Sequence, residues 1–258
     1  MIVSQHLTID GNLFHPPTTY RSLVGAPQYL TITRPNITHA VNSVSQFMHA
    51  PSEHHFQAVK RILRYIKGTL HFGLKITPST TFNISAFSDA DWAGCLDTSR
   101  STSEYAIFLG DNLVSWTSKK QSTVSRSSAE SEYRALALTA AKVKWLLNIL
   151  QDLHLQLSDM PTLFCDNASA IFMAHNPVAR KRSRHMIIDI HFVRELVCNG
   201  VLKIQHVSSN LQIADIFTKS PSKSLFMLFR FKLRVLPTTL DLRGSIGANT
   251  NSSPADNP

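Results

Sequence analysis

Apolar side chains recur with a clear helical period at residues 52–67. They fall on one face of a helix and comprise Phe56, Val59, Ile62, Leu63 and Ile66. Ser52 is a typical helix N-cap residue and Gly68 a typical terminator, so the pattern predicts a helix between them. Residues 1–50 show no sustained period. We expect the prolines there to interrupt any long element; these are Pro16, Pro17, Pro27 and Pro35.

From about residue 82 the pattern changes to short strands. Alternating or β-rich stretches predict three of them, at 83–88, 105–109 and 113–116. Gly110-Asp111-Asn112 between the last two indicates a hairpin. A helix is expected next, because Ser127 and Glu130 fit a capping box and apolar residues then continue at helical spacing to Leu147.

The second half of the chain alternates between short strands and helices. We expect strands at 162–165 and 201–207, and helices at 167–176, 187–197 and 210–218. This order is typical of a mixed α/β layer domain. Residues 222–236 are apolar and basic. Residues 247–258 are rich in Asn, Ser, Pro and Gly, so we expect this tail to be disordered.

Composition and charge restrict the class of partner. The 258 residues are 43% hydrophobic and 17% charged, which is enough apolar material for a packed core. Lys and Arg number 26 against 17 Asp and Glu, a net charge of +9. We therefore expect a polyanionic partner, either nucleic acid or an anionic membrane surface.

The cysteines and the apolar runs indicate the compartment. Cys95, Cys165 and Cys198 are too few and too scattered for a disulfide scaffold and lack the paired spacing of a zinc site, which favours a reducing compartment. No run reaches the ~18 apolar residues of a membrane span, and the first residues do not resemble a secretion signal. We expect a cytoplasmic protein that is not secreted and has no membrane partner.

Four acidic residues stand at the ends of predicted elements, and they are Asp89, Glu132, Asp166 and Asp215. Strand ends and helix starts can converge on one edge of an open α/β sheet. A carboxylate cluster there would suit phosphodiester hydrolysis, because Mg²⁺ prefers hard oxygen ligands and two such ions can activate a water and stabilise the leaving oxygen. Carboxylates at close range also raise one another's pKa, which bound metal would relieve.

Each acid taken alone has a simpler explanation. An aspartate after a strand is often a helix cap or turn former, and a glutamate early in a helix usually complements the helix dipole. Spacing also leaves two assignments open. Glu130 and Glu132 flank the apolar stripe of their helix on opposite sides, and Asp91 shares a strand face with Asp89.

The stretches around these acids carry a family resemblance. They read SDADWAG (88–94), SSAESEYRAL (127–136), CDNASA (165–170) and ADIFTK (214–219), with further matches at 20–25, 29–35 and 114–121. Together they resemble the ribonuclease H domain, with the end of the reverse transcriptase, of copia-type retrotransposon Pol polyproteins, over about residues 18–235. Several motifs in order are far more specific than any single acid.

The resemblance implies a fold, a reaction and a site. The fold is α/β, a ribonuclease H-like mixed five-stranded sheet flanked by helices and preceded by a small, mainly helical segment. The reaction is cleavage of the RNA strand of an RNA–DNA hybrid with two Mg²⁺ ions, or Mn²⁺ in their place. The catalytic and metal-binding acids map onto Asp89, Glu132, Asp166 and Asp215. The motif pattern favours Glu132 over Glu130, and Asp89, which leads its motif, over Asp91.

The same resemblance divides the chain into three parts. Residues 1–80 resemble the C-terminal part of the reverse transcriptase, residues 81–221 the ribonuclease H domain, and residues 222–258 form the basic-apolar segment and tail. The expected partners are the hybrid and the rest of the Pol polyprotein, in the cytoplasm or in virus-like particles. One departure from the family is Glu104, which stands where the family usually has glycine.

A basic run is the main candidate for binding the hybrid backbone. Its members are Arg180, Lys181, Arg182 and Arg184, and they follow the helix after Asp166. They form either a phosphate-binding loop or a solvated one. Asn167 either binds substrate or caps its helix. The competing interpretation of the whole chain is a catalytically silent nucleic-acid-binding remnant of the same fold.

Overall fold

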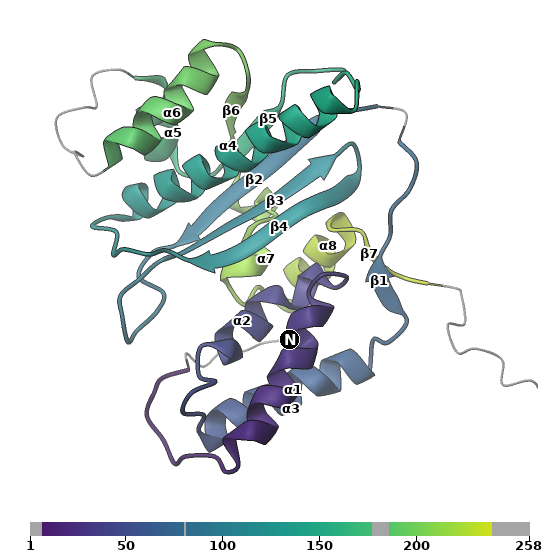
Figure 1. Cartoon of the computed structure of the whole chain (residues 1–258), viewed down its shortest axis with the longest axis vertical. Coiled ribbons are helices and arrows are strands. Elements are labelled where there is room, and N and C mark those ends of the chain that lie inside the picture. The colour runs from purple at the N-terminus through teal and green to yellow at the C-terminus, as the bar shows by residue number, and fades with distance from the viewer. Residues whose placement is uncertain (1–6, 80, 177–185, 239–258) are drawn as a thin grey trace, which may run out of the picture.

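The computed structural model of the chain describes residues 7–79, 81–176 and 186–238 (Figure 1). The α-helices are α1 (Pro17–Leu30), α2 (Thr38–Ser45), α3 (Glu53–Lys67), α4 (Ser128–Asp152), α5 (Ala168–His175), α6 (Ile187–Cys198), α7 (Asp215–Thr218) and α8 (Lys223–Lys232). The strands are β1 (Phe72–Leu74), β2 (Ile84–Asp91), β3 (Thr102–Leu109), β4 (Asn112–Lys120), β5 (Thr162–Cys165), β6 (Lys203–His206) and β7 (Val235–Pro237). Short 3₁₀ turns lie at Pro35–Ile37 and Ser209–Leu211.

A mixed five-stranded sheet forms the centre of the molecule, in the order β4-β3-β2-β5-β6. The pairs β2–β3 and β3–β4 are antiparallel, whereas β2–β5 and β5–β6 are parallel. The predicted mixed α/β sheet, flanked by helices and preceded by a helical segment, is therefore confirmed. Because β2 and β5 are parallel neighbours, their C-terminal ends meet at one edge of the sheet.

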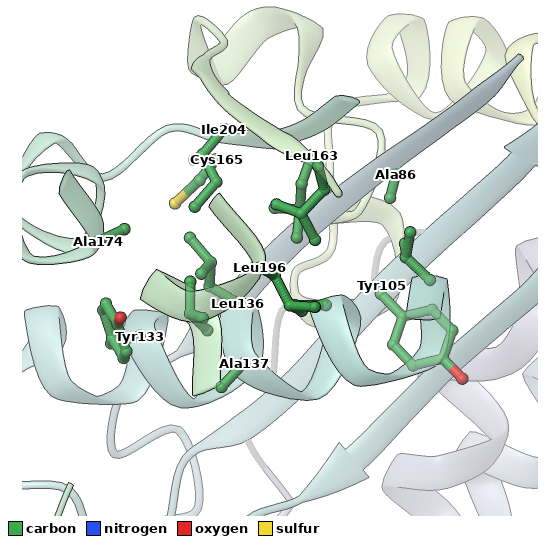
Figure 2. Close-up of a cluster of buried hydrophobic side chains, with 14 of the residues drawn as sticks. Ala86, Tyr105, Tyr133, Leu136, Ala137, Leu163, Cys165, Ala174, Leu196 and Ile204 are labelled. Atoms are coloured by element: carbon green, nitrogen blue, oxygen red, sulfur yellow. The ribbon is translucent and has the colours of Figure 1, made fainter. Parts of the chain in front are cut away.

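Helix α4 lies across one face of the sheet (Figure 1), and its apolar stripe packs against the strands. Tyr133 and Leu136 on α4 are fully buried, and so is Leu163 on β5. Figure 2 shows these side chains meeting between the helix and the strands. Burial of one such leucine contributes roughly 1.5–3 kcal/mol. The stripe therefore fixes the rotation of α4 about its axis, and with it the direction of every polar residue on that helix.

The opposite face of the sheet is covered by the last part of the chain. Phe217 of α7 and Phe229 of α8 are buried there against Phe108 of β3. The basic-apolar segment that begins at residue 222 thus supplies part of the core. No helix in the described part of the chain is long and apolar enough to cross a membrane.

The N-terminal helices form a core of their own, in which the hydroxyl of Tyr20 donates a hydrogen bond to the carbonyl oxygen of Val44 at 2.7 Å. Strand β1 pairs with β7 in an antiparallel two-stranded sheet. The segment that precedes the five-stranded sheet in the sequence therefore pairs with the segment that follows it. The boundaries expected at residues 80 and 221 stay a prediction.

Two local predictions are wrong. The prolines of residues 1–50 were expected to interrupt any long element, but helix α1 continues through Pro27, which lies in its last turn. Pro17 occupies the first turn, where no backbone N–H is needed. The helix expected at 210–218 is instead a 3₁₀ turn and the separate α7, because Gln212 between them is extended and its side-chain amide donates to the carbonyl of Ser88 at 2.9 Å. The tail expected to be disordered, 247–258, lies outside the described residues.

Candidate active site

Asp89 is the innermost acid of the site. It lies near the C-terminal end of β2 and is 1% exposed. The hydroxyl of Thr218 donates a hydrogen bond to its Oδ2 at 3.0 Å, and the Lys219 ammonium lies 3.6 Å from the same oxygen. Two residues around the end of α7 therefore fix the orientation of a carboxylate that is carried by the sheet.

Asp166 and Asp215 converge on Asp89 from two other elements. Asp166 directly follows β5 and accepts a hydrogen bond from the Ser209 hydroxyl at 3.1 Å. Asp215 is the first residue of α7, and its Oδ1 lies 3.3 Å from the Lys219 ammonium. One carboxylate oxygen from each of the three aspartates lies within 4.8 Å of the others. Residues up to 126 positions apart in the sequence thus form one anionic cluster.

Glu132 adds a fourth carboxylate from the other side. It lies near the start of α4 and is 8% exposed. One of its oxygens is within 4.8 Å of an Asp166 carboxylate oxygen. Its Oε2 is buried without a hydrogen-bond partner in the described part of the chain. The structure therefore brings together all four acids that the sequence singled out, whereas their catalytic role stays a prediction.

The cluster holds more negative than positive charge, because several carboxyl groups share one lysine, Lys219. Burial, followed by repulsion from Asp89 and Asp166, raises the pKa of Glu132 to about 9. Burial and Asp89 likewise raise the pKa of Asp215 to about 7. Burial disfavours the Lys219 ammonium, but Asp89 and Asp215 outweigh it and raise the pKa of Lys219. One lysine does not neutralise the negative charge of the clustered carboxylates, so bound protons or added cations must neutralise the rest.

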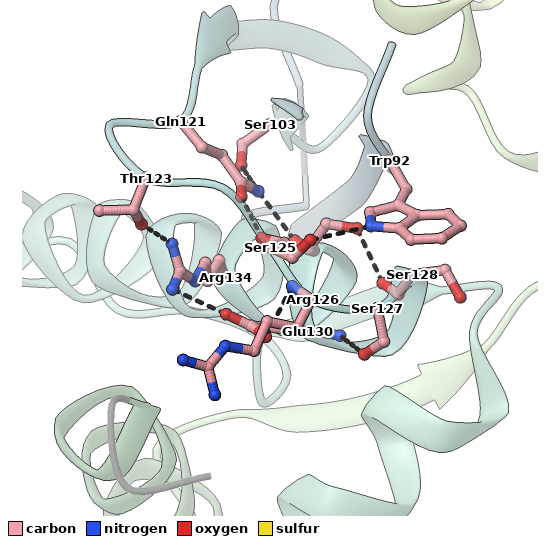
Figure 3. A network of polar contacts seen from close by, with 11 residues as sticks. Trp92, Ser103, Gln121, Thr123, Ser125, Arg126, Ser127, Ser128, Glu130 and Arg134 are labelled. Carbon is pink, nitrogen blue, oxygen red and sulfur yellow. Dashed lines mark hydrogen bonds and ion pairs between the residues drawn. The ribbon is translucent and has the colours of Figure 1, made fainter. Parts of the chain in front are cut away.

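Geometry separates the two pairs of acids that spacing left open. Figure 3 shows Glu130 turned toward the start of its own helix, where it accepts from the backbone N–H of Arg126 at 3.0 Å and pairs with Arg134 at 2.8 Å. The Asp91 carboxylate lies against Gly94, where an added Cβ would fall 1.6 Å from Asp91 Oδ2. Neither belongs to the groups of acids close enough to share one ion among the described residues.

Comparison with known proteins places the chain in a family. No family model matches it. It is 45% identical over 226 residues to the retrovirus-related Pol polyprotein from transposon RE1 of Arabidopsis thaliana, which covers 88% of this chain. It is 43% identical over 237 residues to that from transposon RE2 of the same plant, covering 92% of this chain. The chain belongs to the copia-type retrotransposon Pol family.

This Pol-family chain corresponds to a small part of its relatives. It spans 15% of the length of the RE1 polyprotein and 16% of that of RE2. Among solved structures it is similar to LC11-RNase H1 in complex with an RNA/DNA hybrid, with a TM-score of 0.38 and 11% identity over 50% of this chain and 88% of that one.

A fifth carboxyl lies beside Asp89 in this Pol-family chain. Glu104 on β3 is the direct cross-strand partner of Asp89 and is fully buried. The Ser118 hydroxyl donates to its Oε1 at 3.3 Å, and burial, with Asp89 next, raises the pKa of Glu104 well above its ordinary value. The sequence showed Glu104 only as a departure from the family, because strand register cannot be read from motifs.

The nucleic-acid contacts expected from sequence are described only in part. Asn167 caps α5, because its Oδ1 accepts from the backbone N–H of Ala170 at 3.0 Å. The capping interpretation therefore holds, and contact with substrate stays a prediction. The basic run lies outside the described residues; its members are Arg180, Lys181, Arg182 and Arg184.

The donor set fits a hard divalent cation. Clustered carboxylates are the ligands that Mg²⁺ and Mn²⁺ prefer. The three aspartates offer oxygens close enough to share an ion, and the Glu132 Oε2 is an unused buried acceptor beside them. Polar partners of these acids that the sequence reasoning missed are Thr218, Lys219 and Ser209. Thr218 and Lys219 belong to the closing motif ADIFTK, and this was the only sequence signal for their place in the site.

Proposed function

We propose that this chain hydrolyses the RNA strand of RNA–DNA hybrids endonucleolytically, as the ribonuclease H part of a copia-type Pol polyprotein. The observation that carries the proposal is the convergence of Asp89, Asp166 and Asp215 to within 4.8 Å, with Glu132 beside Asp166. The Pol-family relatives support the same role. Location in the cytoplasm or in virus-like particles, and assembly with the rest of the polyprotein, are parts of this proposal.

The four acids would hold two Mg²⁺ ions, or Mn²⁺. When bound, such ions generate a nucleophilic hydroxide and stabilise the leaving oxygen of the phosphodiester. The chain's own contribution is to fix the ligands. Thr218 holds Asp89 and Ser209 holds Asp166, while burial keeps bulk water from Glu132. The Lys219 ammonium balances part of the cluster's charge next to Asp89 and Asp215.

Substrate binding requires contacts that read backbone and shape, because a nuclease of this class needs no base sequence. We assign this role to the basic run, with Asn167, which directly follows Asp166, as a further contact. Its members are Arg180, Lys181, Arg182 and Arg184. Neutralising the run should weaken hybrid binding and reduce its salt dependence, and an unchanged salt slope would reject the contact.

A cleavage assay on the full chain tests the proposal. A hybrid with end-labelled RNA is incubated with Mg²⁺, with EDTA, and with the Asp166→Asn variant. Asp111→Asn is the matched control, because Asp111 is an exposed aspartate in the turn between β3 and β4. We expect cleavage by the wild type and the control, and at least a hundredfold less with Asp166→Asn or EDTA. Equal cleavage by Asp166→Asn would reject the assignment.

One observation favours the second candidate, a silent nucleic-acid-binding remnant. The Lys219 ammonium already pairs with Asp89 and Asp215, so it competes with a metal ion for the same oxygens. Retained hybrid binding without cleavage by the wild type in Mg²⁺ or Mn²⁺ would establish this alternative. Cleavage that the Asp166→Asn change abolishes would exclude it.

A further inference from the structure

A sulfur atom lies beside the carboxylates. Cys165 is the last residue of β5, directly before Asp166, and is fully buried. Its Sγ, one Glu132 carboxylate oxygen and one Asp166 carboxylate oxygen lie within 4.8 Å of one another. This group shares Asp166 with the three-aspartate cluster, but it has the Glu132 carboxylate and a soft sulfur in place of Asp89 and Asp215.

One oxygen of this group has no hydrogen-bond partner, and its sulfur has only weak backbone contacts. Glu132 Oε2 is buried without a hydrogen-bond partner in the described part of the chain. Cys165 Sγ has two weak backbone contacts, both with Asn167: it accepts from the N–H at 3.4 Å and donates to the carbonyl oxygen at 4.0 Å. A buried cysteine usually packs as a small apolar side chain, but here its sulfur is next to two carboxylates. A buried acceptor without a hydrogen-bond partner is destabilising, and a bound cation would satisfy it.

We propose that Cys165, Glu132 and Asp166 form a binding site for a soft divalent cation of the zinc class, and that filling this site blocks the hard-cation site. One sulfur and two carboxylates are a sufficient protein set for zinc, with water in the fourth position. Ligand atoms on one zinc ion lie roughly 3.5 Å apart, so these side chains need to close by only about 1 Å.

Binding is a ligand exchange with no redox change. The Cys165 thiol loses its proton to solvent, the metal–sulfur bond forms, and the metal ion gives up water molecules in return. A cysteine is a metal ligand only as the thiolate, so the ion must displace the proton of the buried Cys165 thiol. Zinc-class ions form bonds to thiolate strong enough to do this, whereas Mg²⁺ does not.

Inhibition follows from the shared ligands. Asp166 belongs to both groups, and an ion on Cys165 would also neutralise Glu132. Mg²⁺ would then lose a ligand and face a second positive charge within a few ångströms. This part of the inference rests on the proposed function, whereas binding of the soft ion does not.

Cadmium provides a direct readout, because a cadmium–thiolate bond has a charge-transfer absorption band in the ultraviolet. The full chain is titrated with Cd²⁺ as wild type, as Cys165→Ser, and as the double variant Cys95→Ser/Cys198→Ser, whose one remaining cysteine is Cys165. We expect a band that saturates at one Cd²⁺ per folded chain in the wild type and the double variant, and no band with Cys165→Ser. No band in the folded double variant would overturn the proposal, whatever the stability of Cys165→Ser.

Two aspartate variants separate the two groups. Asp215→Asn should keep the cadmium band, because Asp215 belongs only to the oxygen group, whereas Asp166→Asn should weaken Cd²⁺ binding at least tenfold. Equal weakening by both variants would show that the ion lies among the three aspartates. With hybrid and Mg²⁺, we expect Zn²⁺ to inhibit the double variant at least tenfold more strongly than Cys165→Ser. Absence of cleavage in every sample would end the proposed function but leave the cadmium result intact.

Discussion

Replacing Glu132 by glutamine should make the metal-free protein more stable at alkaline pH. Folding raises the pKa of Glu132 from an ordinary 4.5 to about 9. A carboxyl whose pKa is higher in the folded state loses stabilisation as pH rises from its unfolded value to its folded value, because the folded protein must give up a proton that it holds tightly. The window for Glu132 is therefore about pH 5 to 9.

The structure sets the size of this effect. At 1.36 kcal/mol per pKa unit, a rise from 4.5 to about 9 corresponds to an upper bound of about 6 kcal/mol. Asp89, Asp166 and Lys219 share the same charge balance, so relaxation among them reduces the expected gain for Glu132→Gln to roughly 2–4 kcal/mol at pH 9. Near pH 5 the variant and the wild type should differ by less than about 1 kcal/mol.

Urea unfolding in EDTA at several pH values between 5 and 9 measures this difference. Glu130→Gln is a matched control two residues earlier on the same helix. It should destabilise the chain at neutral pH, because it removes the ion pair with Arg134 and weakens the acceptor for the Arg126 N–H. Parallel loss of stability in the wild type and Glu132→Gln across the window would refute the reasoning. Adding Mn²⁺ should restore stability to the wild type at pH 9 far more than to Glu132→Gln.

Two further predictions concern the scaffold and are measured by thermal or urea unfolding. Leu136→Ala, at a fully buried position of α4, should cost about 2–5 kcal/mol, and Leu138→Ala, at a position 38% exposed, less than about 1 kcal/mol; equal losses would show that α4 does not pack as described. Gly94→Ala should destabilise the loop after β2 by about 1–3 kcal/mol, because its Cβ would fall 1.6 Å from Asp91 Oδ2. Gly25→Ala, in a helix with nothing within 4 Å, should be neutral or stabilising by about 0.5–1 kcal/mol.

Sequence patterns predicted the elements in which apolar residues recur at a regular spacing, or which have characteristic turn residues. Helices α3 and α4 were predictable because their apolar stripes extend over several turns, and the hairpin was marked by its turn residues, with Gly110 at a φ of +56°. Strands β1 and β7 have only three residues each, too few for a period, and their pairing joins residues more than 160 positions apart. Gln212 split a predicted helix through one contact with a distant strand, which no local pattern records.

The candidate site was predictable in its acids but not in their surroundings. Ordered motifs selected the four carboxylates, while spacing alone could not separate Glu132 from Glu130. Rotation of α4 and the Arg126 and Arg134 contacts of Glu130 separate them in the fold. The position of Glu104 opposite Asp89 depends on strand register, and register is set by three-dimensional pairing rather than by local sequence.

Anomalous diffraction from crystals of the full chain grown with Mn²⁺ tests most directly whether these acids form a divalent-cation site. We expect a strong anomalous peak bonded to carboxylate oxygens of Asp89, Asp166 and Asp215 at about 2.0–2.3 Å, with Glu132 beside a second ion or its water shell. A well-ordered structure in which Mn²⁺ is absent from these acids, or binds only elsewhere on the surface, would contradict it.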